Sequence, residues 1–346
     1  MRTILLLLFL ILLPAERAFP VTPDLYTGEA AVADQGEAER RSALPKALEQ
    51  VLSRQSGLRG FEDFPVVEPA LQRASSIVLS FHYRSVEILG ADGSSEEETR
   101  LVARFSAREV DELMRSLQLP LWRPERNPVE TWLVIDDGQG RRVFPVELDY
   151  ARQSLARVAE RRALPLTWPQ PDEDGEFPVD LQLLWGGYTE ELVGDDGKAA
   201  MILAARREGP MWSVRTNLAY GEENWAWRLQ DIDLLSVLDE SMEQAIDRIA
   251  SASTIAAEDL GIWVHRLKVT GLRGRGDYER CLDYLQGIST VNHVAVASAR
   301  SPSVDFRLEL NALPRYLEEN IEGDGVLEAT GVEGEYRLLG RANNER

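Results

Sequence analysis

Cysteine and histidine are scarce in this sequence, and their scarcity narrows the chemistry that the chain can perform. The 346 residues include one cysteine and three histidines. A single cysteine cannot form a disulfide within the chain. His82, His265 and His293 show neither a metalloprotease motif nor a paired metal-ligand spacing. The sequence therefore predicts no metal site and no cofactor. A Ser-His-Asp triad stays an open alternative, although no nucleophile-elbow motif is present.

Positive charge is also in short supply. Lysine and arginine number 38 against 58 aspartate and glutamate residues, so the formal net charge is −20 and the pI is about 4.7. Proteins that bind nucleic acid or anionic lipid present cationic surfaces. We therefore expect no general nucleic-acid binding and no docking on anionic membranes. The hydrophobic share of 44% is typical of folded chains, and the length suits about two or three domains.

Long apolar runs are confined to the N-terminus. Residues 4–13 form an unbroken apolar run of ten residues after Arg2. A bilayer-spanning helix needs about 20 residues, and a shorter run after a positive start is typical of a secretory signal peptide. We expect residues 1–18 to be a signal peptide cleaved after Ala18. Cleavage after Ala15, or retention as an uncleaved anchor, are the alternatives. After cleavage we expect a periplasmic protein without stable membrane insertion.

Turns and changes of periodicity divide the mature chain into three expected domains, residues 19–142, 143–254 and 260–340. Each mixes short strands with amphipathic helices, so we expect an α+β protein with several small antiparallel sheets. The first domain is expected to follow the order β-α-α-β-β-α-β. A capping box, formed by Ser106 and Glu109, predicts the start of its last helix.

The second domain is expected to contain a helix, three antiparallel strands joined by short turns, and an amphipathic helix that opens at Asp231. The third domain has the clearest pattern. Val304, Phe306, Leu308 and Leu310 alternate with polar residues, which predicts a half-buried strand. Its element order, β-α-β-β-α-β, is that of ferredoxin-like domains.

Two features of the third domain have both a structural and a chemical interpretation. Cys281 lies on the apolar face of a predicted helix, which favours a buried structural thiol over a reactive one. The stretch GLRGRG, residues 271–276, lies between a strand and a helix that we expect Asp277 to cap. Its arginines would suit an anion at the helix N-terminus, but its spacing matches neither the dinucleotide fingerprint nor a Walker loop, which favours a plain turn.

Four tryptophans of the second domain are the candidate ligand-binding residues: Trp185, Trp212, Trp225 and Trp227. Exposed indole rings can stack on the faces of sugars. However, Trp212 shares its strand parity with Val214, and Trp225 and Trp227 share theirs. Aromatic packing across neighbouring strands is therefore the favoured interpretation, and a ligand-binding cluster is the alternative.

Three stretches carry a resemblance to a known family. They are residues 26–35 (YTGEAAVADQ), 163–169 (ALPLTWP) and 200–206 (AMILAAR). In these stretches the chain resembles the bacterial domain-of-unknown-function 2066 family. It departs from the family pattern at Pro45 and in lacking a glycine before Arg206. The resemblance implies an exported Gram-negative envelope protein, and it transfers no catalytic residue because the family has no assigned activity.

These observations favour a periplasmic protein that acts by binding another envelope protein, as an accessory or adaptor, without catalysis. Open sheet edges of small α+β domains suit partners that add an extended strand. The alternative is a glycan- or small-ligand-binding protein that uses the four tryptophans. A hydrolase is the third interpretation, and it requires a cleft that holds perturbed carboxyl groups or a histidine-based pair.

Overall fold

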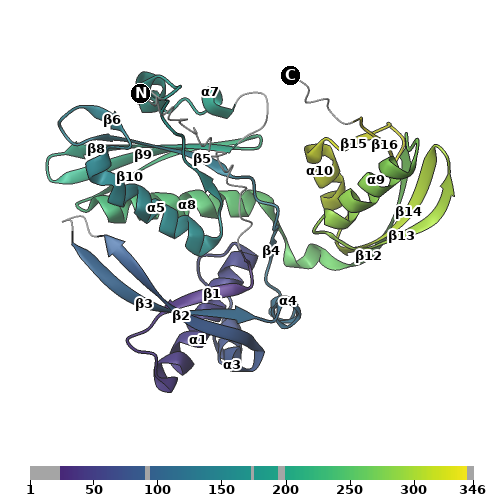
Figure 1. Ribbon diagram of the computed structural model, residues 1–346, viewed down its shortest axis with the longest axis horizontal. Coiled ribbons are helices and arrows are strands. Elements are labelled where there is room, and N and C mark those ends of the chain that lie inside the picture. The colour runs from purple at the N-terminus through teal and green to yellow at the C-terminus, as the bar shows by residue number, and fades with distance from the viewer. Residues whose placement is uncertain (1–23, 90–93, 173–174, 194–198, 341–346) are drawn as a thin grey trace, which may run out of the picture.

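The computed structural model describes residues 24–89, 94–172, 175–193 and 199–340, and the predicted signal peptide lies outside them. Helices and strands alternate around several separate small sheets, so the chain is α+β, as the sequence predicts. Three units, each with its own hydrophobic core, are visible in Figure 1. No helix in the described ranges is long and apolar enough to cross a membrane.

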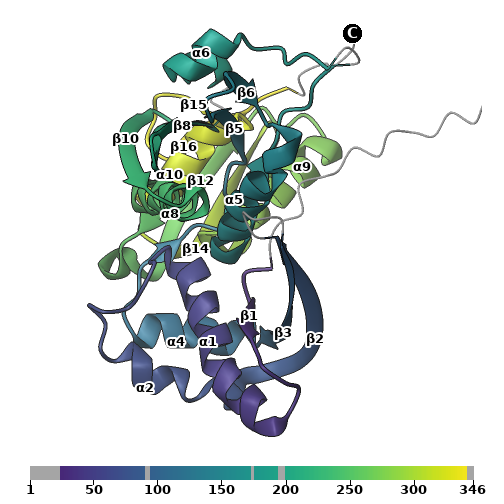
Figure 2. The ribbon, with the colours of Figure 1, turned by 90° about the vertical axis from the view of Figure 1, so that its left-hand side faces the viewer.

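The N-terminal unit packs helices on one face of a three-stranded antiparallel sheet in the order β1-β3-β2 (Figure 2). Its elements are β1 (Thr27–Ala31), α1 (Glu37–Ser56), α2 (Val67–Leu71), α3 (Ala74–Ile77), β2 (Val78–Leu89), β3 (Ser95–Phe105) and α4 (Ala107–Ser116). Ser106 caps α4 as predicted, because its hydroxyl accepts from the Glu109 N–H. Gly28 lets β1 approach α1 closely, since a Cβ there would lie 1.9 Å from the Ala47 carbonyl oxygen.

The middle unit is a layered structure around the sheet β10-β9-β8-β5-β6. Its strands are β5 (Val129–Asp136), β6 (Arg141–Val143), β7 (Leu166–Thr167), β8 (Ala199–Glu208), β9 (Met211–Tyr220) and β10 (Glu223–Asp231). Its helices are η1 (Val146–Leu148), α5 (Asp149–Arg162), α6 (Leu181–Gly186), α7 (Glu190–Val193) and α8 (Leu234–Ser253). Helices α5 and α8 cover the sheet face toward the N-terminal unit, and α6 packs on the opposite face (Figures 1 and 2).

Strand β5 precedes residue 143, where the sequence places the start of the second domain. In the structure β5 pairs in parallel with β8 over its whole length and lies inside the middle sheet. The helix α5 connects the two strands, as parallel pairing requires. The strand therefore packs with the middle unit although its sequence pattern follows that of the first domain.

The C-terminal unit places two helices on one face of a five-stranded sheet in the order β13-β14-β12-β16-β15. Its elements are β12 (Leu260–Thr270), α9 (Arg275–Gly287), β13 (Val291–Arg300), β14 (Ser303–Ala312), α10 (Pro314–Asp324), β15 (Leu327–Ala329) and β16 (Glu335–Leu338). Strand β16 runs parallel to β12, because the additional strand β15 precedes it and pairs with it in a hairpin. A ferredoxin-like sheet needs these strands antiparallel, so that detail of the prediction is not confirmed.

Helix α9 also begins earlier than predicted. It starts at Arg275 after the N-cap residue Gly274, whereas the sequence places Asp277 at the cap. The Asp277 carboxylate instead accepts from the Arg273 N–H at 3.0 Å. The carboxylate thus stabilises the turn before the helix. This contact agrees with the interpretation of residues 271–276 as a plain turn.

Buried arginines join the N-terminal and middle units. Arg126 donates to the carbonyl oxygens of Arg54 and Ala163, and its guanidinium lies 3.6 Å from the Trp122 ring centroid. Burial lowers the pKa of Arg126 to about 9. Arg162 pairs with Glu243 and donates to the Gly57 carbonyl at 2.9 Å. These guanidinium groups satisfy carbonyl oxygens at the ends of helices from both units.

The C-terminal unit is attached through the short strands β4 (Leu121–Trp122) and β11 (Thr254–Ile255), which pair with each other, and then through η3 (Ala257–Asp259). Glu125 accepts from the Ser289 N–H at 2.9 Å and from its hydroxyl at 2.6 Å. Arg123 donates to the Asn320 side chain at 2.9 Å. Polar contacts therefore fix this unit beside the segment that follows β4.

Candidate functional site

The four tryptophans predicted as a ligand-binding cluster lie on opposite faces of the middle sheet. Trp212 on β9 and Trp225 and Trp227 on β10 pack against the core beneath α5 and α8. Trp185 on α6 packs against the smaller core on the other face. All four rings are half-buried. The structure thus separates Trp185 from the other three, and they do not share one surface.

Arginine side chains already contact three of these rings. The guanidinium carbon lies 4.1 Å from the ring centroid for Arg248 over Trp227, and 4.5 Å for Arg141 over Trp185. Arg207 lies 6.0 Å from the ring of Trp212. A cation over an aromatic face is a favourable contact, and it competes with a sugar for that face. This arrangement favours a packing role for Trp212 and Trp227.

The histidines are dispersed. His82 lies on β2 of the N-terminal sheet, whereas His265 and His293 lie on β12 and β13 of the C-terminal sheet. In register, His265 faces Leu308 and His293 faces Glu309, so the two side chains point to opposite sides of that sheet. His265 is half-buried and its Nε2 has no hydrogen-bond partner in the described structure.

Cys281 is buried in the C-terminal core, as predicted. Burial raises the pKa of its thiol to about 12, with a smaller opposing effect from Arg280. A thiol with this environment carries almost no thiolate near neutral pH. Cys281 therefore has the properties of a packing residue.

Three carboxyl groups have a pKa raised chiefly by burial: Glu49, Asp111 and Asp239. They lie on α1, α4 and α8 respectively. Asp111 accepts from the Tyr26 hydroxyl at 3.0 Å, and Asp239 accepts from the Ser154 hydroxyl at 2.6 Å. None of the three lines a pocket described below. Within the described residues no group of three histidine, cysteine, aspartate or glutamate side chains could hold a metal ion.

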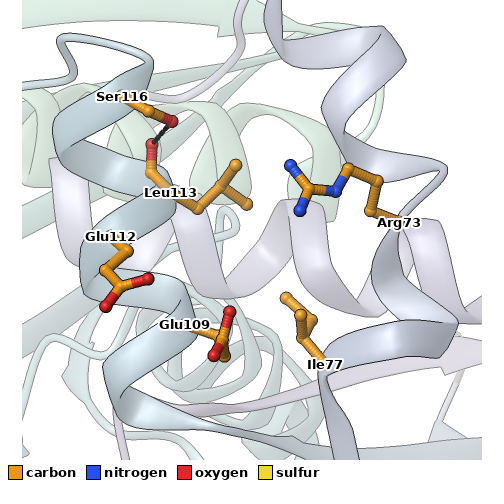
Figure 3. A pocket seen from close by; sticks show the side chains of 6 residues that line it. All are labelled: Arg73, Ile77, Glu109, Glu112, Leu113 and Ser116. Atoms are coloured by element: carbon orange, nitrogen blue, oxygen red, sulfur yellow. Dashed lines mark hydrogen bonds between the residues drawn. The ribbon is translucent and has the colours of Figure 1, made fainter.

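Figure 3 shows a hollow of about 230 Å³ in the N-terminal unit, between α3 and α4. Arg73 reaches into it from one side, opposite Leu113, while Glu109 and Glu112 line it from α4. Both glutamates also lie 3.5 Å from the exposed Arg108 guanidinium. Charges of both signs meet there in an exposed setting, where ion pairs contribute little. Arg73 and Glu112 are exposed, so the charged lining of the hollow is not desolvated.

Exposed apolar side chains gather at the start of β12. Ile262, Trp263 and Val264 are consecutive, and they are 78%, 41% and 56% exposed. Successive side chains of a strand point to opposite faces, so β12 presents apolar surface on both sides. Burial of such surface contributes roughly 25 cal/mol per Å². This stretch therefore has the properties of an interaction surface.

The first part of β12, residues 260–267, has no strand paired along one of its edges and is the free half of this strand. Strand β14 pairs with β12 from Leu260 to Val269, but β16 pairs only with residues 268–270. The Lys268 N–H donates to the Gly334 carbonyl, on the β16 side, at 2.8 Å. Because backbone groups alternate in direction along a strand, the N–H groups of Val264 and Arg266 point to that side too. No strand among the described residues pairs with them there, although Gly334 lies close to the Arg266 carbonyl oxygen, so the open stretch of the edge is the one around Val264.

Two other edge strands, β13 and β10, have features that disfavour the addition of a strand. Strand β13, at the opposite edge of the C-terminal sheet, has register shifts between Val291 and His293 and between Val296 and Ser298. Bulges of this kind twist an edge away from regular pairing. Strand β10, at the edge of the middle sheet, exposes polar side chains such as Glu223 and Asn224. The free half of β12 has one register shift of its own, between Leu260 and Trp263, but its exposed side chains from Ile262 to Val264 are apolar.

The family model of a domain of unknown function, DUF8605, matches residues 20–123. The expected resemblance to the domain-of-unknown-function 2066 family is therefore wrong: the match is to a different domain. One reason is that residues 200–206 form most of the buried strand β8, and an apolar run of this kind is common to many buried strands.

Among solved structures, the chain is similar to the N-terminal domain of Protein Y from Thermus thermophilus, with 11% identity and a TM-score of 0.21. The alignment covers 36% of this chain and 98% of that domain. A TM-score this low supports no inference about a shared fold. No curated protein matches the chain.

The free half of β12 could not be located from the sequence patterns. The available signal was the unbroken triplet Ile262-Trp263-Val264, which is apolar at both parities. Such a run is typical of a strand that is buried on both faces, or of an exposed strand that binds another chain. The two cases differ in whether a neighbouring strand covers the run, and β16 pairs only with residues 268–270.

Proposed function

We propose that this protein is a non-catalytic binding protein of the bacterial periplasm that recognises a protein partner by strand addition. The free half of β12 carries the proposal, because it combines unpaired edge backbone with exposed apolar side chains. In strand addition the main-chain hydrogen bonds supply affinity, and alternate side chains supply specificity. Export rests on the apolar run at residues 4–13.

The surroundings of β12 define the chemistry of the partner segment. Ile262 and Val264 lie on one face of the sheet, and Trp263 lies on the other, so we expect apolar side chains at alternate positions of the segment. Further along the strand, Arg266 lies directly opposite Arg307 in register, and both are exposed. Like charges in this position repel each other. An acidic residue of the segment beside Arg266 would relieve that repulsion.

Site-specific photo-crosslinking in cells tests this function. A photoreactive residue replaces Val264 in one version of the protein and Val296 in a control version. Val296 is matched to Val264 because it is a 45% exposed valine on the opposite edge of the same sheet. We expect one discrete envelope protein to crosslink at position 264 and not at 296, and mass spectrometry to place the crosslink in an extended apolar segment.

Three results would contradict the proposal. Equal crosslinking at both positions would show contact without preference for the β12 edge. Absence of any crosslink at 264, in a protein confirmed to be folded and exported, would remove strand addition as the mode of binding. A crosslink between two copies of the chain would replace the heterologous partner with self-association.

A further inference from the structure

Arginine side chains gather on the face of the middle sheet that lies opposite α5 and α8. Arg206, Arg215 and Arg228 come from β8, β9 and β10 and line a pocket of about 170 Å³ together with Ser213 and Trp185. The strand parity places all three arginines on this one face. The chain as a whole carries a formal charge of −20. This pocket is therefore a local cationic site on an acidic protein.

Arg215 lies on β9, the middle one of the three strands that line the pocket. Its Nη2 donates to the Trp185 carbonyl oxygen at the end of α6, which holds the guanidinium in place. Its Nε is buried and has no hydrogen-bond partner in the described structure. A buried donor without an acceptor is unfavourable by roughly 1–3 kcal/mol, and most such groups have a partner. The Arg215 guanidinium is thus held in place from one side, and its hydrogen-bonding capacity is only partly used in the described structure.

The charges around Arg215 are not balanced. Arg228 lies directly opposite it on the neighbouring strand, an arrangement that is unfavourable for like charges. Burial, followed by the charge of Arg228, lowers the pKa of Arg215. Asp136 lies 3.9 Å from Arg206, and Glu208 also lines the pocket. Neither carboxylate is within ion-pair distance of Arg215 or Arg228 among the described contacts.

We propose that this pocket binds a small molecule through a doubly charged oxyanion group, either a phosphate or a pair of carboxylates. The guanidinium groups of Arg215 and Arg228 donate to its oxygens, since planar guanidinium groups match both kinds of group. The Ser213 hydroxyl supplies a further donor, and the Trp185 side of the pocket limits the size of the ligand. This site is separate from β12, so its test is independent of the proposed protein partner.

Calorimetric titration of the mature protein with inorganic phosphate and with malonate tests the site, with chloride at matched ionic strength as the reference. We expect saturable binding of at least one of the two anions, at one site per chain. The tighter anion identifies the ligand as a phosphate or as a dicarboxylate. No saturable binding of either anion would overturn the proposal.

Two arginine variants locate the binding. Arg228→Gln removes one charged donor and should lower the affinity for the anion about tenfold or more. It should also raise the Tm of the ligand-free protein, because it ends the repulsion with Arg215. Arg207→Gln is the matched control, since Arg207 is an exposed arginine of β8 on the opposite face, and it should leave the affinity unchanged. Equal weakening by both variants would show attraction to general surface charge and would contradict the proposed pocket.

Discussion

Glu243 on α8 holds Arg162, which contacts the N-terminal unit from the middle unit. Replacement of Glu243 by glutamine tests that role. Its carboxylate pairs with Arg161 at 2.6 Å and with Arg162, whose side chain is only 3% exposed. Arg162 in turn donates to the carbonyl oxygen of Gly57 in the N-terminal unit. Glu243→Gln keeps the shape of the side chain and removes its charge. The buried Arg162 would then retain only Asp247, at 2.9 Å, as a charged partner.

The expected loss follows from this burial. Removal of one partner from a buried ion pair is unfavourable by about 3–5 kcal/mol. Because Asp247 stays in place and glutamine still offers an acceptor oxygen, we expect about 2–4 kcal/mol for Glu243→Gln. The matched control is Glu240→Gln, one turn earlier on α8. Its partner Arg59 is 48% exposed, and exposed pairs contribute about 1 kcal/mol or less.

Urea denaturation, followed by far-UV circular dichroism, measures both variants. We expect the midpoint of Glu243→Gln to fall well below that of the parent and the midpoint of Glu240→Gln to stay close to it. Equal losses in the two variants would refute the reasoning, because burial would then not govern the strength of the pair. A loss below about 1 kcal/mol for Glu243→Gln would refute it as well.

The remaining predictions concern the thiol, a buried carboxyl group and the N-terminus. Because the pKa of Cys281 is raised to about 12 by burial, a thiol reagent at pH 8 should label it only after unfolding; rapid labelling of the native protein would contradict this. Burial raises the pKa of Asp239. Between the usual aspartate pKa and this raised value, the folded state therefore binds more protons than the unfolded chain. Stability then falls as the pH rises through that window. Asp239→Asn, which keeps an acceptor for Ser154, should therefore raise the Tm at neutral pH and lose this gain below about pH 4, as thermal melts at the two pH values will show. N-terminal sequencing of the protein recovered from the periplasmic fraction of cells should begin at Phe19, as the predicted cleavage after Ala18 requires, and recovery of intact Met1 would contradict cleavage.

The local features of the fold could be predicted from the sequence. Ser106 begins α4, Cys281 is buried, and Val304 to Leu310 alternate as a half-buried strand. Each depends on neighbours within a few residues, which a pattern of side chains records directly. The α+β class follows from the same local patterns.

The pairing of distant segments could not be predicted. The parallel pairing of β5 with β8 and the position of β15 before β16 are long-range choices that no local pattern encodes. The same limit applies to the candidate sites. Tryptophans close in the sequence are divided between two faces of a sheet, while Arg215 and Arg228 meet only through the register of β9 and β10.

The backbone of β12 allows the most direct test of strand addition. In Val264→Pro the N–H that points to the free edge is removed, whereas Val264→Thr keeps this N–H and a similar shape. Proline is tolerated at such an edge because it does not disturb the pairing with β14. Binding of the crosslinked partner segment should be lost in Val264→Pro and only weakened in Val264→Thr, with the Tm of both variants close to the parent. Full affinity of a folded Val264→Pro variant would contradict recognition by strand addition.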